Sequence, residues 1–403
     1  MARSATRSFT AELARALPDR PFAVELWDGT RLDPTTGDGG GPVFRLRGPD
    51  ALAHVLRAPG QLGVGRAYVS GALEVDDLDA VLELLNGWKP APIDGREQLR
   101  LGALAARAVG LRRPPRRPVS ELRPRGRRHS VERDARAVRH HYDVSNDFFA
   151  LFLDASMTYS CAVFSRGATT LEEAQHAKRE MVCTKLGLQP GERVLDVGCG
   201  WGSFAIHAAR EHGARVVGIT LSEPQARLAR ERVAQAGVGD RVEIRVMDYR
   251  AIDDGPFDVI ASIGMVEHVG NVQIDAYAQQ LHRLLRPGGR LLNHGIARLR
   301  HTDPEAGPFS ERYVFPDAAP LHLSRVLHAL ERAGFEPHHV EDLRHDYAQT
   351  LSHWIANLDG RLDEAVQLAG AERVRVWRLY LRAARNGFRS GFTSIFQVRA
   401  SRP

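Results

Sequence analysis

The chain has 403 residues, of which 43% are hydrophobic and 26% charged, so it can bury one large core or two smaller ones. No stretch approaches the roughly 18 uninterrupted apolar residues of a membrane-spanning helix, and the start lacks the apolar segment of a secretory signal. A net charge of +6 at pH 7 favours polyanionic partners, either nucleic acid or an anionic lipid surface, although a compositional bias toward arginine explains the total equally well.

The chain has only three cysteines, an odd number: Cys161, Cys183 and Cys199. Without a secretory signal, such sparse cysteines predict reduced thiols and a cytoplasmic protein. Their spacing matches no common zinc pattern, so the sequence predicts no metal site.

The N-terminal part, residues 1–100, has the pattern of a small α/β domain. "FAVELWDGTRLD" (22–33) alternates like a strand with a turn, and "PDALAHVLRA" (49–58) and "DDLDAVLELLNGW" (76–88) have helical apolar spacing. "GVGRAYVSG" (63–71) lacks dinucleotide-binding spacing, and we interpret it as a turn leading into a helix.

Residues 101–138 are crowded with arginine and proline and contain few large apolar residues. Such a segment cannot bury enough surface to fold alone, so it is predicted to be a polybasic linker. Four arginines within six residues of this segment are called the arginine cluster: Arg112, Arg113, Arg116 and Arg117.

Residues 139–403 form the predicted catalytic domain, and from about residue 190 strands and helices alternate regularly. This alternation predicts an α/β fold with a parallel, doubly wound sheet. The predicted helices begin at Ser203, at Glu223 and near Asn271. The predicted strands are "ERVLDVGC", "ARVVGIT", "DRVEIRVMD", "FDVIASIG", "GRLLNHGI" and the terminal "FTSIFQVRA".

A glycine-rich loop follows the first of these strands. "LDVGCGWG" places Asp196 at the strand end and Gly198, Gly200 and Gly202 before the helix. The run D-x-G-x-G-x-G differs from the G-x-G-x-x-G of NAD-binding loops and suits S-adenosylmethionine, whose amino-acid end Asp196 can meet.

The next two strand ends support a nucleotide site. "GITLSEPQ" offers Thr220 and Gln225 for the ribose, where many nucleotide folds use an acidic residue, and "MDYR" places Asp248 and Tyr249 beside the adenine. Because three strand ends agree, a glycine run that binds nothing is disfavoured.

Two further strand ends carry a candidate reaction centre. Glu267 and His268 follow the fourth strand in "SIGMVEHVG", and His294 ends the fifth in "NHGI". Glu267 and His294 could act as an acid/base pair or hold a small ion, whereas we interpret His268 as structural.

Six ordered motifs resemble the cyclopropane-fatty-acyl-phospholipid synthase family within the class I methyltransferases, over about residues 139–400. The N-terminal domain and basic linker resemble the longer bacterial phospholipid enzymes of that family rather than its shorter mycolate-modifying members. The motifs are "HYDVSNDFFALFLDASMTYSCAVF", "VLDVGCGWG", "GITLSEPQ", "MDYR", "GMVEHVG" and "DYAQTL".

The resemblance implies that the cis double bond of a phospholipid acyl chain attacks the methyl group of S-adenosylmethionine. Loss of a methyl proton to a bound bicarbonate then closes a cyclopropane ring. The implied bicarbonate site consists of the side chains of Glu267, His294 and Tyr347 and the backbone of Cys161 and Ile296. The implied cofactor contacts are Tyr159, Ser160, Gly198, Gly200, Thr220, Leu221 and Gln225.

The aromatic stretch before the glycine loop has two interpretations. Ser145 can cap a helix whose apolar surface is either ordinary core or part of the wall of an acyl tunnel. That surface consists of Phe148, Phe149, Leu151 and Phe152. The polybasic linker ahead of it would hold the enzyme at the inner face of the membrane, on anionic unsaturated phospholipid, at roughly 1 kcal/mol per basic residue.

Two alternatives remain open. A fatty-acyl methyltransferase of the same family that adds a methyl or methylene branch would share every motif. A non-catalytic basic protein that binds lipid or nucleic acid belongs to another class, and the intact glycine loop disfavours it. We expect no nucleic-acid partner, because no base-flipping motif is present, and the sequence leaves a homodimer open.

Overall fold

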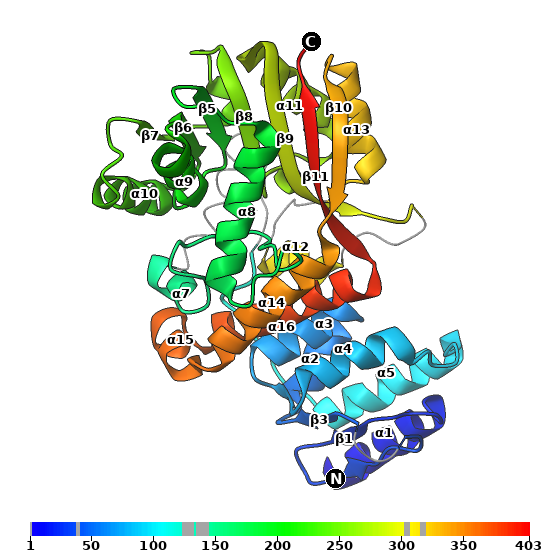
Figure 1. Ribbon diagram of the computed structural model, residues 1–403. Helices are drawn as coiled ribbons and strands as arrows, with labels where there is room; N and C mark the ends of the chain where they lie inside the picture. The colour runs from blue at the N-terminus through cyan, green and yellow to red at the C-terminus, as the bar shows by residue number, and fades with distance from the viewer. Residues whose placement is uncertain (1, 38–40, 123–132, 134–144, 302–306, 315–319) are drawn as a thin grey trace. The chain divides into compact units, whose positions relative to one another are not determined.

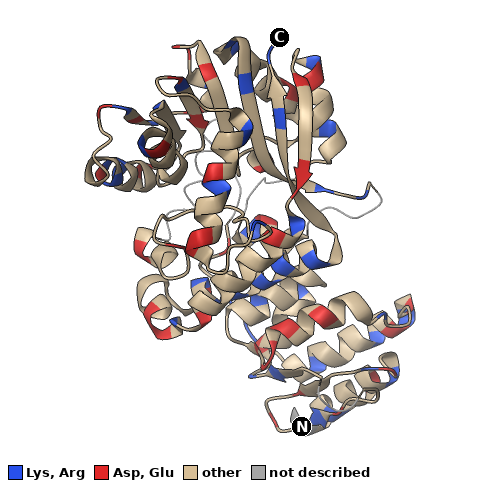
Figure 2. Ribbon diagram, in the orientation of Figure 1, with Lys and Arg blue, Asp and Glu red and all other residues tan. Residues whose placement is uncertain are grey.

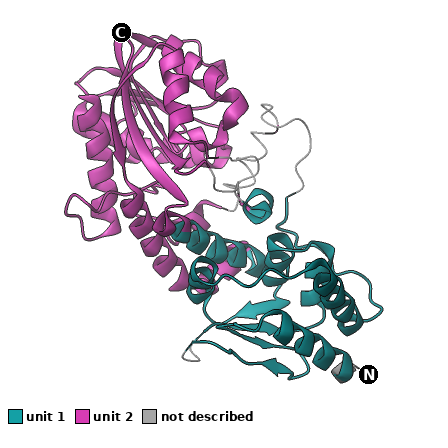
Figure 3. Ribbon diagram, turned by 90° about the vertical axis from the view of Figure 1, so that its right-hand side faces the viewer, with its two compact units in different colours: residues 1–123, 307–313, 370–386 teal, residues 124–306, 314–369, 387–403 magenta. Residues whose placement is uncertain are grey.

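The computed structural model describes residues 2–37, 41–122, 133, 145–301, 307–314 and 320–403 (Figure 1). The chain divides into two compact units (Figure 3). Unit 1 comprises residues 1–123, 307–313 and 370–386, and unit 2 comprises residues 124–306, 314–369 and 387–403. Among the described residues, no helix is long and apolar enough to cross a membrane.

Unit 1 contains a four-stranded sheet in the order β2-β1-β3-β4. Its strands are β1 (Ala23–Glu25), β2 (Arg31–Leu32), β3 (Val43–Leu46) and β4 (Leu73–Val75). Its helices are α1 (Ala2–Ala16), α2 (Asp50–Arg57), α3 (Gln61–Val69), α4 (Leu78–Gly87), α5 (Gly95–Val109), α12 (Pro308–Tyr313) and most of α16 (Ala371–Ser390). The predicted strand–turn–strand and both predicted helices are therefore present.

The prediction of a turn at "GVGRAYVSG" was wrong, because these residues lie largely within α3. Its glycines serve close packing. A Cβ on Gly63 would lie 2.3 Å from the carbonyl oxygen of Ala58, and one on Gly65 would lie 2.4 Å from the Phe309 ring. Glycine is required here by contact with neighbouring groups, which the local sequence does not reveal.

The predicted linker begins inside a helix. α5 starts at a capping box formed by Asp94 and Glu97 and continues to Val109, past the expected boundary at residue 101. Residues 110–122 contain no helix or strand. Apart from Arg133, the rest of the predicted linker lies outside the described residues.

Residues 110–122 are fastened to unit 1 by specific bonds. Arg57 donates to the carbonyl oxygen of Pro115 at 3.0 Å, and the amide of Val119 donates to Glu372 at 2.9 Å. A buried ion pair joins Arg66 and Glu121 through two hydrogen bonds of 2.6 and 2.7 Å. The arginine cluster itself stays exposed.

Unit 2 is built on a seven-stranded sheet in the order β10-β11-β9-β8-β5-β6-β7. The strands are β5 (Arg193–Val197), β6 (Arg215–Thr220), β7 (Val242–Val246), β8 (Phe257–Ile263), β9 (Leu285–Arg298), β10 (Glu336–Asp342) and β11 (Thr393–Ser401). Strands β9, β8, β5, β6 and β7 pair in parallel, which confirms the predicted doubly wound sheet. β11 pairs antiparallel with both β9 and β10, a direction that apolar alternation does not encode.

Helices cover both faces of this sheet and enclose two hydrophobic cores (Figure 1). One core packs α8 (Leu171–Leu186), α9 (Ser203–His212) and α10 (Glu223–Gln235) onto the sheet, and the other packs α11 (Gly270–Leu284) and α13 (Leu323–Arg332). The other described elements of unit 2 are α7 (Asn146–Ala150), η1 (Tyr249–Ala251), η2 (Val266–His268), α14 (Arg344–Asp359) and α15 (Leu362–Ala369).

Candidate active site

The glycine loop turns the chain from β5 into α9 at the carboxyl edge of the sheet. Gly198, Gly200 and Gly202 have φ angles of 82°, 55° and 80°, which favour glycine. A Cβ on Gly200 would point into open space, whereas one on Gly202 would lie 3.3 Å from the Ala229 Cβ of α10. Gly200 therefore leaves room for a ligand, and Gly202 lets two helices approach.

Two pockets lie at this edge and share Gly198, Gly200, Gln225 and Gly264 in their walls. Pocket A lies over the ends of β6 and β7, and Met247, Met265 and Val269 give it an apolar side. The predicted cofactor residues in its wall are Gly198, Gly200, Thr220, Leu221, Gln225, Asp248 and Tyr249. The Thr220 hydroxyl donates to the Gln225 amide oxygen at 2.8 Å, so the two polar groups expected near the ribose are joined.

Pocket B lies on the other side of the glycine loop. The predicted residues Tyr159, Ser160 and Asp196 line it, so every predicted cofactor residue except Gly202 lines one of the two pockets. Asp196 is almost fully buried, and its Oδ2 has no hydrogen-bond partner among the residues described. Burial raises the pKa of its carboxyl to about 7, against the opposing effect of Lys178.

Lys178, on α8, is a wall residue of pocket B that the sequence analysis missed. Its side chain is 1% exposed and its ammonium donates to the Ser160 hydroxyl at 3.0 Å. Burial and the neighbouring Arg179 lower its pKa to about 7. The signal was present in the helical spacing, because Lys178 falls on the stripe that also holds the buried Leu171 and Val182.

The predicted reaction centre begins with Glu267, in η2 directly after β8. Its Oε1 accepts a hydrogen bond of 2.7 Å from the backbone amide of Ile296, while its buried Oε2 has no partner in the described part of the chain. Burial raises the pKa of the Glu267 carboxyl to about 7, although the bond from Ile296 acts in the opposite direction. Glu267 and the backbone of Ile296 are thus brought together as expected.

His294, on β9, is completely buried and its protonation can be derived from its neighbours. Lys185 donates to the Gln397 amide oxygen at 2.7 Å, which turns the Gln397 nitrogen toward His294 Nδ1 at 2.9 Å. An amide NH₂ can only donate, so Nδ1 accepts and the ring proton resides on Nε2. None of the described residues makes a hydrogen bond to that Nε2. Burial, together with Lys178 and Lys185, holds the His294 pKa well below its usual value.

Cys161 and Tyr347 are connected through the start of α14. The Cys161 thiol faces the carbonyl oxygen of Leu343 at 3.8 Å, and the Tyr347 amide donates to the same carbonyl at 3.0 Å. Thr350 accepts from the amide of Ala162 at 3.0 Å and Asp346 from that of Phe164 at 2.6 Å. These bonds hold the segment containing Cys161 against the helix containing Tyr347.

The predicted catalytic residues line neither pocket, but they lie beside them. Gly264, which lines both pockets, donates its amide to the carbonyl oxygen of His294 at 2.8 Å. Lys178 of pocket B interacts electrostatically with both Cys161 and His294. The candidate reaction centre is therefore contiguous with the candidate cofactor site.

His268, interpreted from the sequence as structural, lies at the candidate cofactor site. It lines pocket A, and burial lowers its pKa to about 4. The helical turn η2 after β8 brings its ring to the pocket, a reversal that an extended continuation of the strand would not produce.

The aromatic stretch forms a packed cluster. Ser145 caps α7 as predicted, accepting from the Phe148 amide. Phe148, Phe149, Leu151 and Phe152 are all buried, and none lines pocket A or B. Tyr159, at the wall of pocket B, stacks on Trp354 with ring centroids 5.1 Å apart. The acyl tunnel stays a prediction.

The chain is similar to several known proteins. Residues 129–398 match the family described as mycolic acid cyclopropane synthetase. The chain is 37% identical to a probable fatty acid methyltransferase of Pseudomonas putida, over 95% of this chain and 92% of that protein. It is 34% identical to the cyclopropane-fatty-acyl-phospholipid synthase of Escherichia coli, over 91% and 89%. The solved mycolic acid cyclopropane synthase CmaA1, complexed with SAH and CTAB, is 35% identical and superposes with a TM-score of 0.63 over 66% of this chain and 98% of its own.

The pockets fit the two ends of S-adenosylmethionine. The methionine end carries an ammonium and a carboxylate, and pocket B offers the unpartnered Asp196 carboxyl and the Lys178 ammonium. The open space beside Gly200 joins this charged end to the largely apolar pocket A, which suits an adenine ring.

Proposed function

Because this chain belongs to the mycolic acid cyclopropane synthetase family of S-adenosylmethionine-dependent methyltransferases, we propose that it converts the cis double bond of an unsaturated phospholipid acyl chain into a cyclopropane ring. S-adenosylmethionine supplies the ring carbon as an activated methyl group, which accepts the π electrons of the double bond while its bond to sulfur breaks. Removal of one methyl proton then frees the electron pair that closes the ring.

One observation carries the proposal: Glu267 Oε2 and His294 Nε2 are buried, polar and without hydrogen-bond partners among the residues that the structure describes. They come from neighbouring strand ends, since Ile263 at the end of β8 pairs with His294 on β9. Two orphaned polar atoms in a protein interior are costly unless a ligand satisfies them. Bicarbonate, held by these residues with Tyr347 and the backbone of Cys161 and Ile296, would supply the base that takes the methyl proton.

The protonation of these groups suits a small anion. His294 presents an N–H at Nε2, as its bond with Gln397 requires. Glu267, with a pKa of about 7, keeps its proton on a substantial fraction of molecules at neutral pH and can then donate as well. Two donors facing one anion avoid the repulsion that a bare carboxylate would cause, and a negative site stabilises the carbocation that forms beside it.

The arginine cluster supports attachment to an anionic membrane surface. Its members are exposed, and Arg116 and Arg117 line a groove with Arg57. Leu111 and Val119, which flank the cluster, are also almost completely exposed. Basic groups beside exposed apolar side chains are typical of a segment that binds phospholipid headgroups. Lys and Arg also occur on helices of both units (Figure 2), so the cluster adds to a generally basic protein.

A second candidate is a fatty-acyl methyltransferase that leaves a methyl or methylene branch, because the similar Pseudomonas putida protein bears the name of such an enzyme. All three products share the cation formed by methyl transfer: loss of a methyl proton closes the ring, loss of the proton on the methylated carbon leaves a methyl-branched alkene, and a 1,2-hydride shift followed by loss of a methyl proton leaves a methylene branch. Incubation with S-adenosylmethionine and vesicles of unsaturated phosphatidylglycerol, followed by mass spectrometry and proton NMR of the fatty acids, distinguishes them. Upfield signals from ring protons would support cyclopropanation. Vinylic methylene signals or new methyl signals would instead show that the enzyme catalyses the branching reaction.

The anion site is tested in the same assay. Glu267→Gln and His294→Ala should bind S-adenosylmethionine nearly as the wild type does and lose about 10²–10⁴ in turnover, the usual cost of a positioned base. Removing bicarbonate from the buffer should lower wild-type activity and adding it back should restore it. Turnover at the wild-type rate by Glu267→Gln would show that Glu267 takes no part in the reaction. A folded wild type that fails to bind S-adenosylmethionine in calorimetry would instead favour a non-catalytic lipid-binding protein.

A further inference from the structure

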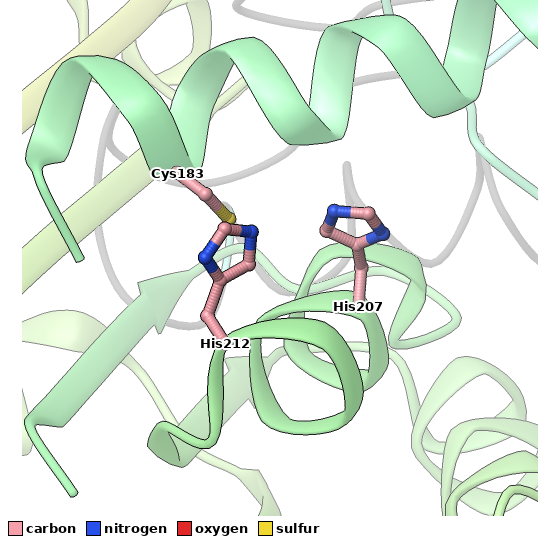
Figure 4. A group of neighbouring side chains, drawn as sticks. All are labelled: Cys183, His207 and His212. Carbon is pink, nitrogen blue, oxygen red and sulfur yellow. The ribbon is translucent and has the colours of Figure 1, made fainter. Parts of the chain in front are cut away.

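A second group of chemically active side chains lies in unit 2, outside pockets A and B. Cys183 on α8 and His207 and His212 on α9 each offer one ligand atom, and these atoms lie within 4.8 Å of one another. Figure 4 shows the Cys183 sulfur pointing from α8 toward the His212 ring, while both imidazoles point from α9 toward α8. None of the three lines the cofactor pockets.

Glu180 lies beside the two histidines of this group. It lies three residues before Cys183 and therefore on the same face of α8. Its Oε2 is 3.2 Å from His207 Nε2 and 3.0 Å from His212 Nε2. One carboxylate oxygen thus lies between two imidazole nitrogens, at separations close to the roughly 3.3 Å expected between ligands of a tetrahedral zinc ion with bonds near 2.0–2.1 Å.

We propose that Cys183, His207 and His212, with Glu180 as the fourth ligand, bind a zinc ion that fastens α8 to α9. One sulfur, two imidazole nitrogens and one carboxylate oxygen form a donor set that suits zinc better than magnesium or calcium, which take oxygen ligands. Cys183 and His207 are buried, whereas the side chain of His212 is 20% exposed and that of Glu180 44%. The ion can therefore reach an otherwise buried site from one exposed side.

The position of the site gives it a structural role. α9 begins at Ser203, immediately after the glycine loop, and α8 carries Lys178 five residues before Cys183. A zinc ion at this place would hold together the two helices that supply walls of pocket B. The spacing of the ligands, split between two helices, matches none of the common zinc motifs, which is why the sequence did not indicate the site.

Zinc binding is tested on the full chain after treatment with a chelator. Competition with a chromogenic zinc indicator should give one ion per chain, and cobalt in its place should give the intense visible bands of a tetrahedral site with a sulfur-to-metal charge-transfer band. His212→Ala and Cys183→Ser should each weaken zinc binding by more than the roughly 10–100-fold that loss of an outer-shell group costs. His212→Ala changes a partly exposed position at the end of α9, so it keeps the test valid if Cys183→Ser does not fold.

His176→Ala is the matched control, because this histidine contacts the His207 ring at a centroid distance of 5.3 Å but lies outside the ligand group. It should bind zinc with the affinity of the wild type. Added zinc should raise the melting temperatures of the wild type and of His176→Ala by the same amount. The proposal is overturned if the wild type takes up no zinc, if cobalt gives only weak octahedral bands, or if His212→Ala keeps wild-type affinity.

Discussion

Replacing Glu267 by glutamine should change the pH dependence of stability in a direction that the structure fixes. The Glu267 carboxyl has a pKa of about 7 in the folded protein and 4.5 as its ordinary value, because burial disfavours the charged form. Below pH 4.5 the group is protonated in both folded and unfolded chains and contributes nothing. As the pH rises from about 4.5 to 7 the unfolded chain loses its proton first, so stability falls, and above pH 7 the loss is complete.

The size of this effect follows from the same two values. A difference of about 2.5 pKa units corresponds to about 3 kcal/mol at 1.36 kcal/mol per unit, of which about 2.5 kcal/mol is lost between pH 5 and pH 8. Glutamine does not titrate, so the variant avoids this loss. It also leaves an amide donor without a partner at a fixed cost of about 1–3 kcal/mol, which is the same at both pH values and cancels in the comparison.

The assay is urea denaturation of wild type and Glu267→Gln at pH 5 and pH 8. The free energy of unfolding of the variant minus that of the wild type should rise by about 2–3 kcal/mol between the two pH values. Glu331→Gln changes an exposed carboxyl on α13 and should stay within about 0.5 kcal/mol of the wild type at both. A difference for Glu267→Gln that does not vary with pH would show that this carboxyl is not held protonated by burial.

Three further variants probe the cofactor site and the membrane surface. Gly200→Val should abolish S-adenosylmethionine binding in calorimetry because its side chain would fill the open space beside the loop, while Gly239→Val, at another open glycine, should bind normally. Lys178→Met should weaken the same binding about 10–100-fold, the equivalent of losing one hydrogen bond to a charged group, and an unchanged Kd would remove Lys178 from the methionine end. Changing the arginine cluster to glutamine should decrease the fraction of protein that sediments with anionic vesicles and the salt dependence of that binding, while cofactor affinity stays unchanged. Equal sedimentation of variant and wild type would show that the segment only connects its neighbours and does not bind the membrane.

The sequence predicted the positions of those site residues that directly follow a predicted strand. The carboxyl ends of parallel strands meet at one edge of a sheet, so recognising β5, β6 and β7 was enough to bring Asp196, Thr220 and Asp248 to the same pair of pockets. In these cases the side chain lies within a few residues of a strand whose direction was already known.

Positions set by tertiary packing could not be derived in the same way. Lys178 approaches the site from a helix: its place on the stripe with Leu171 and Val182 indicates burial, but only the packing of that helix shows that the side chain reaches pocket B. The turn of η2 points His268 into pocket A, and an apolar strand such as β11 has the same pattern in either direction. Unit 1 also contains residues 307–313 and 370–386, which lie far along the chain, and no local sequence pattern indicates that they pack with the N-terminal residues.

Because unit 1 includes these two later segments, the N-terminal residues cannot be removed without exposing part of its core. Unit 1 includes α12 and most of α16, where Tyr313, Val376 and Trp377 are at most 2% exposed. A chain shortened to begin at residue 124 would keep these two helices but lose the rest of the core against which they pack, and their apolar faces would meet water. The N-terminal unit is therefore not a detachable module: a shorter enzyme with the same catalytic fold would need different residues on both helices.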